Sequence, residues 1–212
     1  NIFLIAEALE RQWITSGDVK GITAEEAYNK AIELSFIHFG VSEYYEDYIK
    51  SETYNRIGTS VAYTHTTPAS AETMQYIDGY TNKNVTVQYQ YPDGSRTLYG
   101  GQLNDHLSKI FTQKYIAQLP YLVQECWSDY RRVGLPFFDI PANEKMMTGT
   151  DMTEWKPDSW TSGQKWQYYP QRMRYPTTLD NANPTEYNHA LELLGGANTT
   201  MVPLWWSMGA IK

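Results

Sequence analysis

Metal, cofactor and thiol chemistry each require particular side chains close together, and this sequence keeps those side chains apart. A zinc site needs His, Cys or carboxylate ligands around one centre, but the four histidines are scattered and none belongs to a His-Glu-x-x-His motif. The single Cys126 has Glu125 and Trp127 as neighbours, and neither is a base that would activate a thiol. The sequence therefore predicts no metal site, no cofactor and an inert, structural Cys126.

Other kinds of catalytic site also lack their motifs. No Gly-x-Ser-x-Gly is present, and Gly100-Gly101 is not followed by Lys-Ser or Lys-Thr, as a phosphate-binding loop would be. A glycosidase needs two carboxylates about 5–10 Å apart across a sugar. Several acids are available, but their spacing selects no pair: Asp78, Asp93, Asp139 and Asp151. We predict that the chain is not an enzyme.

Aromatic side chains in predicted loops are better suited to binding than to catalysis. The chain contains 18 Tyr and 7 Trp. Aromatic rings stack on the apolar faces of neutral sugars, while nearby amides and carboxylates meet the hydroxyl groups. The predicted ligand-binding residues have this character: Tyr63, His65, Asp78, Tyr80, Asn82, Trp155 and Trp160. The same aromatic residues could instead anchor long loops to the body of the protein.

The net charge and the hydropathy of the chain bear on two possible partners, nucleic acid and the lipid bilayer. The formal net charge is −7, and no run of Lys or Arg exceeds two, which argues against nucleic acid as a partner. No apolar run approaches the roughly 18 residues that span a bilayer. We therefore expect no direct membrane crossing.

The elements that would position these residues begin with two helices. Residues 2–13 carry apolar side chains at helical spacing. Thr23 and Glu26 form a capping box that starts a second helix, which we predict to end at Gly40. Its predicted core face is Ala27, Ala31 and Leu34, and the small alanines would let the two helices approach closely, as in a tetratricopeptide-like hairpin.

The middle of the chain changes its periodicity. Residues 42–57 are predicted to be helical and residues 58–70 to be a loop. Alternating side chains in residues 76–91 predict a strand, and the turn at residues 92–95 would return it as a second strand through Thr97 and Tyr99.

Helical spacing returns at Leu103 and continues to about Leu119. A further helix is predicted over residues 121–132, with Val123, Trp127 and Tyr130 on one face. Arg131 and Arg132 lie in its last turn before Gly134, and by local evidence they form a solvated pair. Residues 137–176 are predicted to be a long ordered loop, and a helix is expected over residues 186–196.

One string in this region is similar to a known signature. It consists of Lys114, Tyr115, Ile116, Ala117, Glu125, Trp127, Asp129, Tyr130, Arg131, Arg132, Gly134 and Pro136. This order resembles the C-terminal signature of the SusD/RagB family of outer-membrane nutrient-binding lipoproteins. Residues 170–176 and 203–206 also resemble the family, although Asp180 is displaced from the expected position and the terminal Trp pair lacks its most frequent neighbours.

The resemblance implies a mainly α, SusD-like helical fold with tetratricopeptide-like hairpins, one small β-hairpin and long ordered loops. It implies capture of oligosaccharides at the extracellular face of the outer membrane of a Gram-negative bacterium of the Bacteroidetes type. The captured ligand would pass, without catalysis, to a SusC-like TonB-dependent transporter on which the protein forms a lid. Since the chain opens at Asn1 inside a helical pattern, we expect residues 1–212 to be the C-terminal part of a single longer domain. The lipid anchor would lie in the missing N-terminal part.

Three alternatives remain open. The ligand could be an oligopeptide, whose amides would favour polar groups such as Asn82, Gln88 and Gln90. The chain could belong to a glycan-processing enzyme, or it could be a purely structural helical scaffold.

Overall fold

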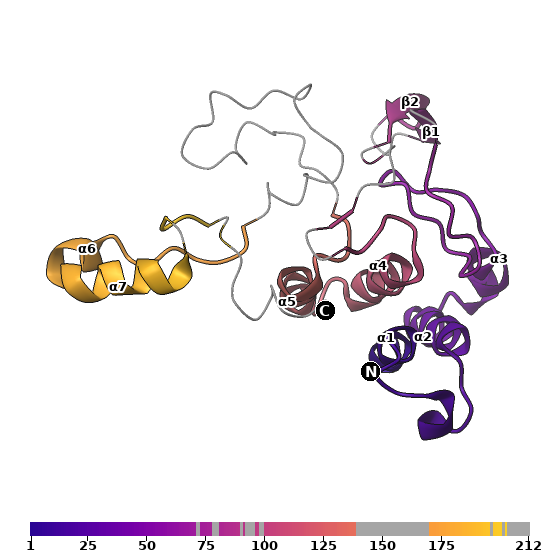
Figure 1. Ribbon diagram of the computed structural model, residues 1–212. Coiled ribbons are helices and arrows are strands. Elements are labelled where there is room, and N and C mark those ends of the chain that lie inside the picture. Colours follow the sequence, from indigo (N-terminus) through magenta and orange to yellow (C-terminus); the bar gives the residue numbers. More distant parts are fainter. Residues whose placement is uncertain are drawn as a thin grey trace.

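The computed structural model describes residues 1–70, 73–77, 81–89, 91, 96–97, 100–138, 170–195, 197–200 and 202. Within these ranges the chain is mainly α-helical, as the sequence predicts, with one two-stranded antiparallel sheet. The α-helices are α1 (Ile2–Glu10), α2 (Ala24–Phe39), α3 (Tyr45–Ile49), α4 (His106–Gln118), α5 (Val123–Val133), α6 (Thr178–Ala182) and α7 (Pro184–Leu194). The strands are β1 (Thr73–Ile77) and β2 (Asn84–Gln88), and two short 3-10 turns are η1 (Ser16–Val19) and η2 (Ser42–Tyr44). In Figure 1, α1 to α5 gather in one body, whereas α6 and α7 lie apart from it.

Helices α1 and α2 pack on each other through small side chains. The capping box at the start of α2 is confirmed, because Thr23 Oγ1 accepts the Glu26 N–H and a Glu26 carboxylate oxygen accepts the Thr23 N–H. Gly40 ends α2 in the left-handed region with φ +70°, a conformation that costs glycine little. Ala27 and Ala31 are buried as predicted, but Leu34 is 41% exposed, so that part of the predicted core face is wrong.

Helix α4 separates two clusters of buried apolar side chains. Ile110 belongs to the cluster formed with α1 and α2, and Phe111 belongs to the cluster formed with Val133 and Leu135. Consecutive helical residues point about 100° apart, so one helix can serve two cores. The segment leading into α5 is therefore the centre of the described fold.

Two predicted helices are shorter than their apolar patterns suggest. Helix α1 ends at Glu10 rather than at residue 13, and Trp13 is 61% exposed. The helix predicted over residues 42–57 stops at Ile49. The Asn55 side chain accepts hydrogen bonds from the N–H groups of residues 57, 58 and 59, which gives this backbone a turn in place of a helix. The N–H groups of Val61 and Ala62 both donate to the Ser51 carbonyl and draw the following loop back onto this point.

The β-hairpin is present, but its strands pair differently from the prediction. Strand β2 lies within the predicted strand and pairs with β1, which precedes it, in the register Met74↔Val87. Residues 92–95 and Tyr99 lie outside the described residues. Thr97 folds back on Gly101 instead, with its N–H donating to the Gly101 carbonyl at 2.8 Å. Gly100 at φ +86° permits this tight turn, so Thr97 does not pair with the predicted strand, whereas the prediction for Tyr99 lies outside the described residues.

None of the helices in the described part of the chain has both the length and the apolar composition needed to cross a bilayer.

Candidate functional site

A buried lysine supports the loop that carries the candidate site. Lys109 of α4 is 1% exposed, and its Nζ donates to the Ser60 carbonyl at 2.8 Å, Ser60 Oγ at 2.8 Å and Asn104 Oδ1 at 2.7 Å. All three ammonium hydrogens thus have neutral acceptors. Burial lowers the pKa of Lys109 to about 8, although the charges of Asp105 and Glu52 act in the opposite direction.

Asn104 connects this lysine to the far end of the same loop. Its Oδ1 also accepts the Ser60 N–H at 2.8 Å, and its Nδ2 donates to the carbonyls of His65 and Thr67. Asn104 has φ +64°, in the left-handed region that Asn tolerates better than most residues. The side chains of Asn104 and Lys109 therefore fix the backbone of residues 60–67 through hydrogen bonds.

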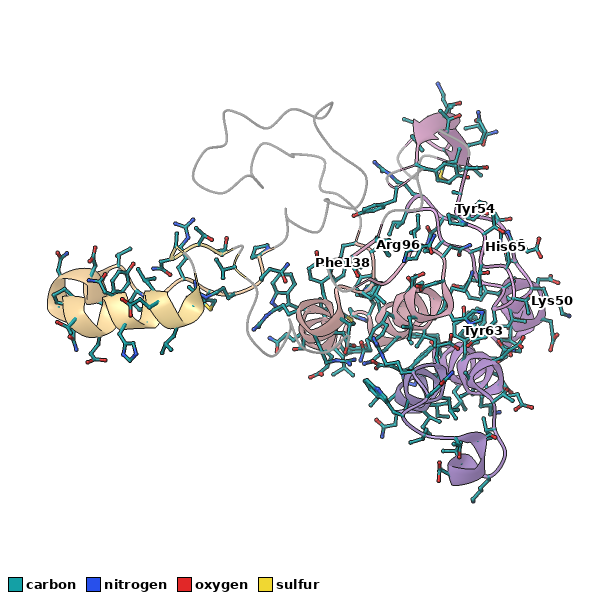
Figure 2. All side chains as sticks on the ribbon, viewed as in Figure 1. Lys50, Tyr54, Tyr63, His65, Arg96 and Phe138 are labelled. Carbon is teal, nitrogen blue, oxygen red and sulfur yellow. The ribbon has the colours of Figure 1, made fainter. Side chains whose placement is uncertain are left out.

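Three aromatic side chains lie on the outer surface of this loop, and we call them the Tyr54 cluster: Tyr54, His65 and Tyr89. The Tyr54 ring centre is 5.3 Å from that of His65 and 6.1 Å from that of Tyr89. All three are half-buried, and Figure 2 shows Tyr54 and His65 side by side beneath the β-hairpin. The cluster joins a loop to the strand end, and it presents ring faces together with polar atoms.

The hydrogen bonds of the cluster run outward from Lys109. Because Ser60 Oγ accepts from Lys109, its own hydrogen is available for His65 Nδ1 at 2.9 Å. This arrangement favours the His65 tautomer with its proton on Nε2, 3.4 Å from the Tyr54 hydroxyl. The Tyr54 hydroxyl in turn donates to the Thr67 carbonyl at 2.9 Å. These bonds hold His65 and Tyr54 in place, as a binding surface requires.

The signature residues of α5 form a charged connection instead of a solvated arginine pair. Arg132 donates to both carboxylate oxygens of Glu7 in α1, at 2.8 and 2.9 Å, and to Asp129 at 3.0 Å. Glu7 is 3% exposed. Burial alone would raise the Glu7 pKa, but Arg132 and Arg11 together hold that pKa below its ordinary value. Lys114 binds the other oxygen of Asp129, so the network joins α1, α4 and α5.

The other features of α5 agree largely with its sequence. Gly134 ends the helix with φ +71°, and Tyr130 is buried, although Val123 at the start of the predicted face is 47% exposed. Cys126 is buried, its Sγ donates to Gln118 Oε1 at 3.0 Å, and burial raises the pKa of its thiol. The thiol is thus kept protonated, as an inert structural cysteine would be.

The described residues offer little for catalysis. No three His, Cys, Asp or Glu side chains among them are grouped so that they could hold a metal ion. Ser60 and Lys109 have the residue types of a nucleophile and a base, but they are 4% and 1% exposed. Ser60 Oγ and Lys109 Nζ are both engaged in hydrogen bonds to each other, to His65 and to Asn104, so their contact serves the loop.

A sequence profile of SusD-like proteins, described as Susd and RagB outer membrane lipoprotein, matches residues 1–207. This chain belongs to that family. This chain is 28% identical to a solved SusD homologue from Parabacteroides distasonis, with a TM-score of 0.60. The match covers 97% of this chain and 31% of the homologue. A SusD homologue from Bacteroides vulgatus shares the fold at 20% identity and a TM-score of 0.51, over 100% of this chain and 35% of that one.

The SusD-like chain thus spans about a third of the length of these two structures. No curated protein matches its sequence.

The predicted ligand-binding residues fall into three groups in the SusD-like fold. His65 lies in the Tyr54 cluster, and Asn82 is exposed in the turn between β1 and β2. Tyr63 is 7% exposed, stacks on His106 at 4.1 Å and donates its hydroxyl to Glu10 at 2.7 Å, so its burial argues against ligand contact. The others lie outside the described residues and stay predictions: Asp78, Tyr80, Trp155 and Trp160.

Sequence reasoning missed four residues of the site. The sequence predicts a helix at Tyr54 and a strand at Tyr89, so it gives neither residue a place on a loop surface. Lys109 and Asn104 carried one usable signal, since Lys109 directly precedes the apolar Ile110 and Phe111 of a helix core. A lysine at such a position must find hydrogen-bond partners within the fold.

Proposed function

We propose that this chain is part of a cell-surface protein that captures oligosaccharides and delivers them, without catalysis, to a SusC-like TonB-dependent transporter. The protein would act as the lid of that transporter, at the extracellular face of the outer membrane, held by a lipid anchor elsewhere in the longer protein. Membership of the SusD/RagB family supports the nutrient-binding class. Within the chain, the observation that carries the proposal is the Tyr54 cluster.

The chemistry of the cluster fits a neutral sugar. The rings of Tyr54 and Tyr89 offer partly exposed apolar faces of the kind that stack on pyranose rings. His65 and the Tyr54 hydroxyl are rigidly oriented by the loop beneath them. Asn82 is exposed in the turn between β1 and β2, and Asp78, Tyr80, Trp155 and Trp160 stay predicted ligand contacts.

The proposal is tested by titrating the full-length protein with short oligosaccharides of glucose, mannose and xylose and with short peptides, followed by Trp fluorescence and calorimetry. We expect saturable binding of at least one sugar, weakened several-fold to about tenfold by Tyr54→Ala, because a lost stacking contact is worth about 1 kcal/mol. Trp155→Ala and Trp160→Ala should act in the same direction. Tyr44→Ala is the matched control, since Tyr44 is 63% exposed and lies outside the cluster.

The alternatives separate in the same experiment. Binding of peptides alone would replace the sugar by an oligopeptide ligand. Release of shorter sugars during incubation would indicate a glycan-processing enzyme. If neither panel binds, the oligosaccharide proposal is overturned and a structural scaffold is the better description.

A further inference from the structure

A pocket lies beside the Tyr54 cluster. It has a volume of about 300 Å³ and opens between the end of α3, residues 51–61 and α4. The side chains that matter for its chemistry are Tyr48, Ser51, Thr53, Tyr54, Gln113 and Ile116. Tyr54 therefore belongs both to the cluster and to the wall of this pocket, which places the two features next to each other.

Gln113 gives this pocket a hydrogen-bonding group without a partner. The residue is 6% exposed, and its Oε1 accepts the Tyr48 hydroxyl hydrogen at 3.0 Å. Its amide nitrogen makes no hydrogen bond to any residue in the described part of the chain. Among the described residues the buried side-chain polar atom without a partner is Asn29 Oδ1, so water reaches the Gln113 amide nitrogen, and an acceptor on a ligand can replace that water. The pocket that Gln113 lines is where such an acceptor would be placed.

Hydroxyl groups and apolar surface line the rest of the pocket. Ser51 Oγ accepts only a long contact of 3.4 Å from the Thr53 N–H, and Thr53 itself is exposed. Both hydroxyls can therefore turn toward a ligand. Ile116 is 44% exposed, and with the tyrosine rings it supplies apolar surface beside these polar groups.

The pocket is also uncharged. None of the described residues that line it is Lys, Arg, His, Asp or Glu, so a charged ligand would lose its hydration without gaining a counter-ion from them. Its volume is at the lower end of those that hold small ligands, which suits one ring with hydroxyl edges and an apolar face. We propose that this pocket is a subsite for one neutral sugar residue of the captured oligosaccharide, an inference that rests on the proposed function.

Two substitutions test the subsite in the full-length protein, by calorimetric titration with the glucose, mannose and xylose oligosaccharides. Thr53→Trp blocks the pocket from an exposed position, where a larger side chain does not disturb folding. Gln113→Met removes the free amide at nearly constant volume. Each variant should bind the preferred sugar about tenfold more weakly, the effect of losing one or two hydrogen bonds. Lys50→Trp is the control, because Lys50 is exposed at the end of α3 and belongs neither to the pocket nor to the Tyr54 cluster.

The outcomes distinguish the subsite from the proposed function. If the wild-type protein binds a sugar and both pocket variants bind it equally well, the subsite is overturned and oligosaccharide capture stands. An equal loss in Lys50→Trp would also overturn the subsite, since the effect would then not come from the pocket. If the wild-type protein binds no sugar, the proposed function fails and the subsite fails with it.

Discussion

Lys109 is the residue on which the loop beneath the Tyr54 cluster depends. It brings an ammonium group into the interior with only neutral acceptors, so the charged form is disfavoured there relative to the unfolded chain. The folded-state pKa near 8 lies below the ordinary 10.5. Between these values the unfolded chain binds more protons than the folded chain, and stability therefore rises with pH in that window.

We predict that the free energy of unfolding of the wild-type protein rises relative to that of Lys109→Met from about pH 8 to about pH 10. The increase should be at most about 2 kcal/mol, since each pKa unit is worth about 1.4 kcal/mol. Urea unfolding at several pH values measures it. The window ends near pH 10 because Lys109 of the unfolded chain, with its ordinary pKa of 10.5, begins to lose its own proton there. Parallel pH profiles for the two proteins would refute the prediction.

Tyr63 offers a second test at the scale of single residues. Tyr63→Phe keeps the buried ring but removes the hydrogen bond to Glu10. We expect a loss of about 1 kcal/mol in stability, because Glu10 is partly exposed and can be hydrated instead. Oligosaccharide affinity should not change. A loss of affinity with unchanged stability would instead make Tyr63 a ligand contact.

At the scale of elements, the Glu7–Arg132 pair joins the first helix to the signature helix α5. We predict that Arg132→Met lowers the free energy of unfolding by about 3 kcal/mol, because it leaves a buried carboxylate without its main partner. Glu7→Gln in the Arg132→Met background should recover part of that loss. Chemical denaturation measures both effects.

The pH dependence of this pair has a definite sign. The Glu7 pKa is depressed in the fold, so its contribution is present above the ordinary value of 4.5 and is lost as the pH falls through the folded-state pKa. The difference between the wild-type protein and Arg132→Met should therefore shrink in acid. Lys30→Met is the control, since Lys30 pairs with Glu33 on the surface and should cost at most about 1 kcal/mol. An equal cost for both substitutions would contradict this account.

Elements with local end signals are those that the sequence predicts well. The capping box at Thr23 and the glycines at 40 and 134 act within one helical turn, so they can be found without knowing the fold. The end of α3 and the pairing of β2 depend on contacts made by other segments, such as Val61 N–H on the Ser51 carbonyl. The site is limited in the same way. The sequence predicts His65 as a single binding residue, but the cluster around it depends on contacts between separate segments, which form only in the folded chain.

At the scale of the whole molecule, the described helices differ in how much they bury. Helix α4 buries six consecutive residues, 108–113, whereas α7 buries none. The segment that precedes α6 is held by two sets of hydrogen bonds. The Asn198 side chain accepts the Tyr175 N–H and donates to the Tyr175 carbonyl, and Arg131 of α5 donates to the Gln171 carbonyl. Figure 1 shows that α6 and α7 lie apart from the body formed by α1 to α5.

We predict that the amide hydrogens of α7 exchange with solvent much faster than those of α4 in this 212-residue chain. An isolated helix of 11 residues is marginal in water, and local opening of α7 exposes little apolar surface. Opening α4 would instead disrupt both apolar clusters, so its amides should exchange only through unfolding of the body. Hydrogen–deuterium exchange read by mass spectrometry gives both rates. Equal protection of the two helices would mean that α7 is covered in solution, for example by a second copy of the chain, and a dependence of its exchange on protein concentration would identify that contact.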